Sequence, residues 1–464
     1  MLVESNRTGR GEGRSSHDLL EAGELDTVIV GFSDIHGRLR GKMVPADRFR
    51  RNPSGPIQFS DYVFAVDRAE NVIEPDVKMA WWPLGEGGYR DILVLPEIET
   101  LRVVPWRTRT ALVLGRLETR DGLPFLASPR DILAGIGARL TTRGLKPIVA
   151  AELEFVLYRH SEDEVRDNGF ASPQVLHGDA KPYDVERFEI DEDLLLPILD
   201  GLQAMGFGID CWSVEAGVSQ YEFNWGHGDL LASADKAFLF KPALRQLARK
   251  QGLTATFMAK PDAADMGSSM HLHQSLWDSS NKNVFFEPDS STGLSQVALS
   301  FMAGQLDVMR EFTGLFAPTI NSYKRFVPGA SAGMNATWGI ENPMAGVRAI
   351  LDGEAGTRLE FRLPGADANP YLALTASLTA GLSGLERALQ PGPSSDGDAS
   401  TKTDVPAVAS NLGDAASLLL DSRVARDYFG DTFVDYYAAI CRWEADLARR
   451  AVTDWERQRY LLGS

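Results

Sequence analysis

The sequence predicts an α+β protein built from two units. Residues 20–120 contain several short β-branched or alternating runs, which are typical of strands: 26–34, 91–97 and 110–118. From residue 147 onward, strand-like runs are separated by longer segments of helical periodicity, such as 230–252. We therefore expect a small α+β domain over 20–120 and a larger domain over 125–464.

The amino-terminal unit is expected to begin with a short helix and a β-hairpin. The first 25 residues contain no apolar run, so they predict no secretory signal but a flexible lead-in and a helix from about Ser16. The run 26–34 and the following run RLRGKMVP predict two strands. The residues between them, Asp34, His36 and Gly37, then lie in the hairpin turn.

The larger unit follows a helix with a clear start signal, Ser128 as N-cap and Pro129 at the first helical position. The longest uncharged stretch, 368–385, contains Pro, Asn, Gly, Thr and Ser, and predicts a buried core helix, not a membrane span. Residues 391–415 are rich in Pro, Gly, Ser and Asp, which predicts a long surface loop. The tail from residue 434 predicts an amphipathic helix.

Composition limits the classes of function. The chain has 464 residues, 44% of them hydrophobic and 24% charged, as in ordinary globular proteins. Its formal charge of −17 argues against a surface that holds nucleic acid or an anionic membrane. The sequence has only two cysteines, Cys211 and Cys441, and this low number excludes a disulfide framework and suits a reducing compartment. Their spacing also does not match a metal site. We expect a soluble cytoplasmic protein without nucleic-acid or membrane partners.

Four strand-like segments carry charged residues on a face where apolar core residues would be expected. Each alternates with period two, so one face is apolar and the other polar. The four polar faces, together with Glu215 upstream of one of them, contain five Glu, two His and two Arg. These residues are Glu152 and Glu154; Glu215 and Glu222; His271 and His273; Arg358, Glu360 and Arg362. Any one segment alone would favour a solvated strand face.

Taken together, these faces favour a metal-dependent site. Five carboxylates that converge on one cavity repel each other unless cations neutralise them, and Mg²⁺ or Mn²⁺ with oxygen ligands does so. Metal ions held by carboxylates beside arginines are what phosphoryl transfer needs. The phosphate-binding pattern GxxxxGK[ST] and the dinucleotide pattern GxGxxG are absent, and GEGGYR at 85–90 predicts a turn. A nucleotide would therefore bind on another scaffold.

Seven ordered motifs give the chain a close resemblance to a known family. They are FSDIHG (32–37), AELEF (151–155), EAGVSQYE (215–222), KPDAADMGSSMHLHQSL (260–276), NSYKRFVPG (321–329), RLEFR (358–362) and ANPYLAL (368–374). In these motifs the chain resembles glutamine synthetases of the prokaryotic type I class over nearly its whole length. The resemblance implies a β-grasp amino-terminal domain and a catalytic domain with a curved antiparallel sheet and helices. It also implies a dodecamer of two hexameric rings with active sites at subunit boundaries, where Asp34 reaches the neighbour's site.

The resemblance assigns roles to individual residues. It implies two or three Mg²⁺ or Mn²⁺ ions per site, with ATP as a substrate. One ion is matched by Glu154, Glu215 and Glu222, and the second by Glu152, His271 and Glu360. The remaining matches are ATP-phosphate contacts at His273, Ser275 and Arg358, a phosphoryl-stabilising Arg348, and glutamate contacts at Gly267, Arg325 and Arg362. The implied reaction phosphorylates the glutamate γ-carboxylate, and an amine then attacks the acyl phosphate.

Departures from the family pattern bear on the amine and on regulation. Ser331 stands where ammonia-using members have a Glu that takes a proton from ammonium, and relatives that use larger amines also lack that Glu. Trp338 either lines an amine pocket or is a core aromatic. Met266 and Pro343 replace an Asn near the glutamate loop and an Arg near the phosphate region. Residues 390–427 contain no Tyr, so the family's adenylylation site has no match.

Three hypotheses follow. The first is an ATP-dependent ligase that joins the glutamate γ-carboxylate to an organic amine, favoured by six matched metal ligands and Ser331. The second is an ordinary glutamine synthetase that uses ammonia, against which Ser331 argues. The third is a non-catalytic member kept for binding or assembly, which Pro343 motivates and the matched ligands oppose.

Overall fold

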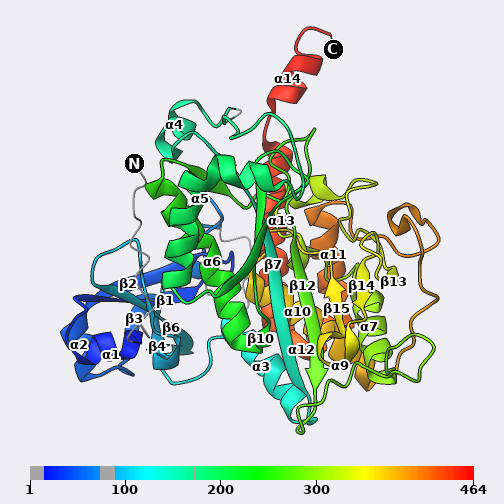
Figure 1. Cartoon of the computed structure of the whole chain (residues 1–464), viewed down its shortest axis with the longest axis horizontal. Coiled ribbons are helices and arrows are strands. Elements are labelled where there is room, and N and C mark those ends of the chain that lie inside the picture. The colour runs from blue at the N-terminus through cyan, green and yellow to red at the C-terminus, as the bar shows by residue number, and fades with distance from the viewer. Residues whose placement is uncertain (1–14, 74–88, 172, 464) are drawn as a thin grey trace, which may run out of the picture.

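A computed structural model describes residues 15–73, 89–171 and 173–463. The chain forms two sheets, with the smaller one at the lower left of Figure 1 and the larger one at the centre. The expected lead-in over the first 14 residues and most of the expected turn at 85–90 lie outside the described residues. No helix in the described part of the chain combines the length and apolarity needed to cross a bilayer.

The smaller sheet is built around the predicted hairpin. Within the described residues it has the order β2-β1-β6-β4-β3, with β5 added to β6. β1 and β6 run parallel, while the other pairs are antiparallel. The elements of this part are α1 (Ser16–Glu21), β1 (Thr27–Ser33), β2 (Leu39–Pro45), α2 (Ala46–Arg51), β3 (Ile57–Ser60), β4 (Asp91–Pro96), β5 (Arg102–Val103) and β6 (Thr110–Thr119). The predicted short helix and strands are therefore confirmed.

The larger sheet has the order β13-β14-β15-β12-β7-β9-β8, with β10 and β11 also paired to β7. The expected antiparallel pattern holds except at one edge, where β13 and β14 are parallel. Six residues connect the two strands, and Glu341, the first of them, has a φ of 50°. This connection returns the chain so that β14 runs in the same direction as β13. The strands are β7 (Lys146–Tyr158), β8 (Ile209–Val214), β9 (Gln220–Trp225), β10 (Gly228–Asp229), β11 (Thr254–Thr256), β12 (Met270–Trp277), β13 (Trp338–Ile340), β14 (Val347–Ile350) and β15 (Arg358–Phe361).

Helices pack around this sheet, and α10, the helix predicted to be buried in the core, lies among them (Figure 1). The stretch 370–384 of α10 is buried throughout. Gly304 and Gly384 let α7 and α10 approach closely, because a Cβ at Gly304 would lie 2.1 Å from the Ala380 carbonyl oxygen. The longer helices are α3 (Pro129–Thr141), α5 (Val185–Ala204), α6 (Leu230–Lys250), α7 (Gln296–Val308), α10 (Pro370–Glu386), α11 (Leu412–Asp421) and α13 (Asp431–Arg450). The shorter ones are α4 (Glu162–Asp167), α8 (Thr313–Phe316), α9 (Gly353–Gly356), α12 (Arg423–Phe429) and α14 (Asp454–Tyr460).

Two sequence expectations need correction. The segment 391–415 is not wholly a surface loop, because Ser395 and Ala399 are buried and α11 begins at Leu412. Its backbone is held by side-chain amides of the larger unit: Asn335 donates to the Ala399 carbonyl at 2.9 Å and Asn342 to the Ser395 carbonyl at 2.7 Å. The tail is two helices, α13 and α14, and α14 projects away from the rest of the chain in Figure 1.

The hairpin is tied to the larger unit by one amide. Asn369 is the N-cap of α10, and its side-chain oxygen accepts a hydrogen bond from the Tyr371 amide. Its Nδ2 donates to the backbone oxygens of Asp34 at 3.2 Å and Ile35 at 3.3 Å. A helix cap in the larger unit therefore also fixes the position of the hairpin turn.

Candidate active site

The register of the larger sheet places the predicted ligands next to one another. Glu152 on β7 pairs with His271 on β12, and Glu154 pairs with Glu222 on β9. Glu360 on β15 pairs with His273 on one side and with Arg348 on the other. Because paired residues of neighbouring strands point to the same face, their side chains converge on one side of the sheet.

Glu152, His271 and Glu360, the second predicted ligand set, lie close to one another. His271 Nδ1 lies 3.5 Å from a carboxylate oxygen of Glu152 and 3.5 Å from one of Glu360. Possible ligand atoms of Glu152, Glu222 and His271 lie within 4.8 Å of one another, as do those of Glu152, His273 and Glu360. The His271 Nε2 atom is buried and has no hydrogen-bond partner. Such an oxygen-rich donor set fits a hard divalent ion.

The other predicted ligands, Glu154, Glu215 and Glu222, share one strongly acidic field. Burial, with the charge of Glu215, raises the pKa of Glu154 to about 7. Burial, with the charges of Glu152, Glu154 and Glu215, raises the pKa of Glu222 to about 9. Burial also raises the pKa of Glu215. These carboxylates repel one another, and a bound cation would remove that repulsion.

Neighbouring polar groups fix the orientation of these carboxylates. Glu154 accepts hydrogen bonds from the Ser269 amide at 2.7 Å and from Gln220 Nε2 at 3.2 Å. Glu215 accepts from Ser213 Oγ at 2.8 Å, and Glu222 accepts from Asn224 Nδ2 at 2.8 Å. Partners that orient a ligand carboxylate in this way are typical of metal sites.

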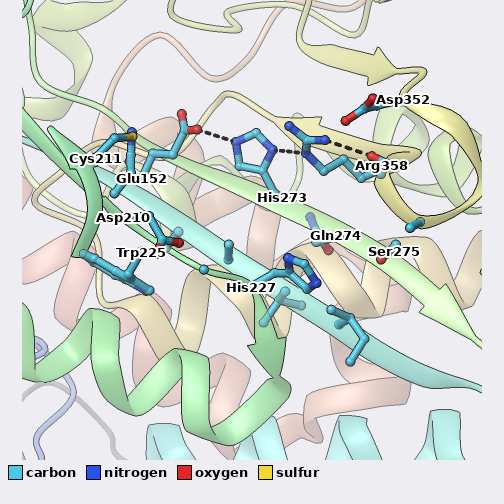
Figure 2. Close-up of a pocket in the computed structure, with 18 of the residues that line it drawn as sticks. Glu152, Asp210, Cys211, Trp225, His227, His273, Gln274, Ser275, Asp352 and Arg358 are labelled. Carbon is cyan, nitrogen blue, oxygen red and sulfur yellow. Dashed lines mark hydrogen bonds and ion pairs between the residues drawn. The ribbon is translucent and has the colours of Figure 1, made fainter. Parts of the chain in front are cut away.

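His273 has a different role from His271. Arg358 Nε, which is always a donor, lies 3.1 Å from His273 Nδ1, so a neutral imidazole carries its proton on Nε2. That nitrogen lies 2.9 Å from Glu152, as Figure 2 shows. Burial would raise the pKa of Glu152, but the His273 and His271 imidazoles outweigh it and lower that pKa. His273 Nε2 therefore lies close to Glu152 without a hydrogen bond of good geometry, while its Nδ1 is engaged by Arg358.

A cavity of about 410 Å³ adjoins Glu152 on this side of the sheet. It is lined by the three residues predicted to contact ATP phosphates, His273, Ser275 and Arg358, together with Trp225 and Asp352 (Figure 2). Arg358 also donates to the Gly356 carbonyl at 2.8 Å, and Ser275 accepts from Trp277 Nε1 at 2.9 Å. The cavity thus places the Arg358 guanidinium on the same wall as Glu152, and an acidic lining with one arginine suits a nucleotide that binds together with a metal ion.

The residues predicted to hold glutamate lie on the opposite flank. Arg325 is 2% exposed and donates to Ser269 Oγ at 3.0 Å and to the Leu363 carbonyl. Burial lowers the pKa of Arg325 to about 10, so it stays charged at neutral pH. A Cβ at Gly267 would lie 2.6 Å from Cγ of Arg325, and Arg362 donates to Glu360. Both guanidinium groups therefore border the carboxylate cluster.

The predicted phosphoryl-stabilising residue, Arg348, is held between two acids. Its Nη1 lies 3.4 Å from Glu360, and its Nη2 lies 2.7 Å from Glu341. Ser331 has φ of 48° and its Oγ lies 2.9 Å from Met344 Sδ. Although GASAG at 329–333 has the spacing of a nucleophile elbow, it lies in an irregular loop and not between a strand and a helix.

Two predicted residues have mainly structural contacts. Trp338 is 5% exposed, and its indole N–H donates to the Gly392 carbonyl at 2.7 Å, as in a core aromatic. Asp34 is fully buried and accepts from the His36 and Arg38 amides and from Arg40 Nε at 2.8 Å. In this conformation the Asp34 carboxylate closes its own turn and is not available to a neighbouring subunit.

Sequence reasoning missed two residues at this site. The charge of Glu215, then burial and the charges of Glu222, Glu152 and Glu154, raise the pKa of Tyr183, so its phenol lies in the field of the carboxylate cluster. Its side chain is 77% exposed and its φ is 62°. Glu341 was missed because it directly follows the short edge strand β13, which has no alternating pattern.

Comparison with known proteins agrees with this geometry. The glutamine synthetase catalytic-domain family matches residues 126–460. The chain is 34% identical to a glutamate–isopropylamine ligase of Pseudomonas sp, covering 96% of both chains. It is 35% identical to gamma-glutamylethanolamide synthetase GlnA4 of Streptomyces coelicolor, covering 96% of this chain and 94% of that one. The structure of GmaS in complex with ADP matches with a TM-score of 0.83 and 28% identity, covering 97% of this chain and 99% of that one.

These matches confirm the predicted fold class and the prediction of a ligase that forms C–N bonds. The match covers most of the chain, including every strand that carries the carboxylate cluster. The chain belongs to the glutamine synthetase family.

Proposed function

We propose that this protein is an ATP-dependent ligase that joins the γ-carboxylate of glutamate to an organic amine. The observation that carries the proposal is the convergence of Glu152, His271 and Glu360 between the cavity lined by His273 and Arg358 and the flank that holds Arg325. Two relatives support the amine class, since their names state isopropylamine and ethanolamide products.

The reaction would proceed in two balanced steps. A γ-carboxylate oxygen of glutamate attacks the γ-phosphorus of ATP, and ADP leaves with the electrons of the broken P–O bond. The amine nitrogen then attacks the acyl carbon of γ-glutamyl phosphate, inorganic phosphate leaves, and one proton is lost from nitrogen. Arg348, which lies beside Glu360, and Arg358, which lines the cavity, would stabilise negative charge on the transferred phosphoryl group.

Divalent cations fit the donor set. The ligands would be Glu154, Glu215 and Glu222 for one Mg²⁺ or Mn²⁺ and Glu152, His271 and Glu360 for another, with a third where ATP brings one. Such ions would neutralise phosphate charge. Arg325, Arg362 and the backbone at Gly267 would bind glutamate, because both guanidinium groups border the carboxylate cluster and a guanidinium is suited to a carboxylate.

The missing carboxylate at Ser331 supports an organic amine over ammonia. A serine hydroxyl facing Met344 offers no negative charge to attract ammonium, and it leaves more room than a glutamate side chain. Trp338 is buried and its indole N–H donates to the Gly392 carbonyl, so we assign this side chain to the core and not to the amine pocket. We infer that Tyr183, whose pKa is raised by the charges of the carboxylate cluster, borders the amine.

Assembly, domains and location complete the proposal. We infer a homo-oligomer, a dodecamer with active sites at subunit boundaries, and two domains over 20–120 and 125–464. We also infer a cytoplasmic location, which the two free cysteines support. Mass photometry of the purified chain tests the assembly, and a monomer at micromolar concentration would contradict it.

The test of the activity is phosphate release with Mg·ATP and glutamate across a panel of amines. The panel contains ammonia, methylamine, isopropylamine, ethanolamine, putrescine, spermine and aniline. We expect one organic amine to support turnover far better than ammonia. Efficient use of ammonia at low millimolar concentration would instead indicate an ordinary glutamine synthetase, and silence with every amine and with other acids would indicate a non-catalytic member.

A further inference from the structure

A second cavity lies between the hairpin turn and the larger unit, away from the carboxylate cluster. Its volume is about 320 Å³, and its walls come from the turn at Gly37, from α6 and from the segment after β11. None of the residues predicted for metal, ATP, glutamate or amine lines it. The proposed reaction therefore leaves this cavity unexplained.

The cavity gathers more positive than negative charge. Arg68, Lys241 and Arg245 line it, against one carboxylate, Asp367. A fourth cation, Arg38, is already paired with Glu70. Asp367 Oδ2 accepts from Thr319 Oγ1 at 2.7 Å and Ser322 Oγ at 2.6 Å, while its Oδ1 has no hydrogen-bond partner, so its negative charge remains. Among the lining residues, Arg68, Lys241 and Arg245 thus outnumber this one carboxylate.

The two arginines make no direct ion pair within the described residues, although Glu444 acts on Arg68 and Glu162 on Arg245 at longer range. Across residues 15–73, 89–171 and 173–463, neither the Arg68 nor the Arg245 guanidinium makes a hydrogen bond or an ion pair. Arg245 lies over the Phe257 ring at 5.2 Å, which orients it without neutralising its charge. A guanidinium beside other cations leaves unused donors that are suited to a carboxylate or phosphate.

The burial of Lys241 makes the excess of positive charge in this cavity energetically unfavourable. Lys241 is 6% exposed, and its Nζ donates to the Ala368 carbonyl at 2.5 Å. Burial lowers the pKa of Lys241, the Asp367 charge opposes this, and Arg245 and Arg68 add to the decrease, so that the pKa lies at about 7. A buried ammonium beside two guanidiniums is unfavourable unless it loses its proton or an anion compensates it, and a bound anion would favour the charged form. Burial lowers the pKa of the neighbouring His36 to about 4, so this residue is neutral and does not offset the positive charge.

We propose that this cavity binds a small organic polyanion, a di- or tricarboxylate or a phosphate compound, which bridges the hairpin turn and α6. Its size is at the lower end of small-molecule sites. Arg68 and Arg245 would bind the anionic groups from two sides, with Lys241 at the base and Thr256 and Asn321 as further hydrogen-bonding groups. Because Arg68 and Arg245 belong to different units, the bound anion would stabilise the contact between them.

Isothermal titration calorimetry on the full-length chain tests this proposal without turnover, so its outcome is independent of the proposed reaction. The protein is stripped of metal on a chelating resin and titrated with citrate or inorganic phosphate, against chloride at matched ionic strength. We expect one anion per chain, and the preference for citrate or phosphate identifies which chemistry the site serves. Heats indistinguishable from chloride up to about 10 mM would overturn the proposal.

Variants locate the bound anion. Arg245→Gln and Arg68→Gln should each weaken binding by about tenfold or more, while Arg245→Lys, which keeps the charge, should lose less. Arg423→Gln, on an exposed helix surface, should leave the affinity unchanged. Arg358→Gln separates this cavity from the ATP-binding wall. Binding that is lost in Arg358→Gln but retained in Arg245→Gln and Arg68→Gln would place the anion in the active site and overturn the proposal.

Discussion

Glu341 holds Arg348 by a hydrogen bond of 2.7 Å between its carboxylate and Nη2. Its other carboxylate oxygen accepts from the Leu351 amide at 2.9 Å, so both oxygens are engaged. Although burial acts against it, the Leu351 amide and the Arg348 guanidinium lower the pKa of Glu341. Glu341 is therefore a positioning residue for Arg348, the arginine that we propose stabilises the transferred phosphoryl group.

The first prediction concerns this pair. Glu341→Gln keeps the shape but removes the charge that fixes Arg348, so kcat should fall by about tenfold while the KM for ATP changes little. Steady-state kinetics with the preferred amine measures both. Glu354→Gln, on the exposed helix α9, is the matched control and should behave as the parent protein. A rise in KM with unchanged kcat would show that Glu341 acts on substrate binding instead.

The second prediction concerns Glu360. It is 1% exposed and lies against His271, Arg348 and Arg362. Glu360→Ala should reduce turnover by roughly a thousandfold or more and lower the number of Mn²⁺ ions bound per chain, because the variant loses a ligand. Phosphate-release assays and Mn²⁺ titration provide the two readings. Substantial activity in the variant would refute the ligand assignment.

The third prediction is a pH dependence of the metal-free protein. The pKa of Glu154 is raised to about 7 and that of Glu222 to about 9, above the ordinary value of 4.5. A carboxyl group with a raised pKa binds more protons when folded, so the stability of the metal-free protein should fall as pH rises from 5 to 9. Mn²⁺ should remove most of this slope, since it replaces protons in the cluster.

Thermal unfolding across this pH range, with and without Mn²⁺, checks the prediction. Calorimetry of Mn²⁺ binding at pH 7 in buffers of different ionisation enthalpy should also show proton release. A melting temperature that rises between pH 5 and pH 9 without metal would contradict the shared acidic field described for these glutamates.

The fourth prediction concerns Ser331. Ser331→Glu adds a carboxylate where the wild-type side chain faces Met344, and it should shift preference from the organic amine toward ammonia. The ratio of kcat/KM for the two amines measures the shift. Ser331→Gln adds similar volume without charge and should reduce use of the larger amine without a gain for ammonia. An unchanged ratio in both variants would remove Ser331 from the amine site.

The fifth prediction concerns the contact of α7 with α10. Gly304→Ala would place a methyl group within 2.1 Å of the Ala380 oxygen, so it should destabilise the protein by about 1–3 kcal/mol or more. Gly135→Ala in α3 meets nothing within 4 Å and should be neutral or stabilising by about 0.5–1 kcal/mol. Denaturant unfolding of both variants checks the contrast, and equal effects would exclude close helix packing as the cause.

Sequence periodicity predicted the strands of the site because alternation depends on local residues only. Glu152 and Glu154 were placed on one face of β7 on that basis. The register that pairs Glu152 with His271, or Glu360 with Arg348, could not be predicted in this way, since it depends on contacts between distant segments. The parallel pairing of β13 with β14 was missed for the same reason.

Charged residues on helices were harder to interpret than those on strands. Lys241 and Arg245 stand one turn apart on α6, in a pattern typical of a solvated helix face. Only the packing of the hairpin turn over α6 reveals that they share a cavity with Arg68. Likewise, the sequence placed Asp34 in a turn, but the contact with Arg40 that engages its carboxylate required the pairing of β1 with β2.

The central position of β7 has a consequence for biosynthesis. β7 is complete at Tyr158, but its partner β12 ends at Trp277, and Glu360 on β15 follows more than two hundred residues after Glu152. A nascent chain emerging from the ribosome therefore exposes an acidic strand long before His271 and Glu360 are made. The chain should acquire its affinity for divalent ions only late in translation, so cellular metal supply would act on the last stage of maturation.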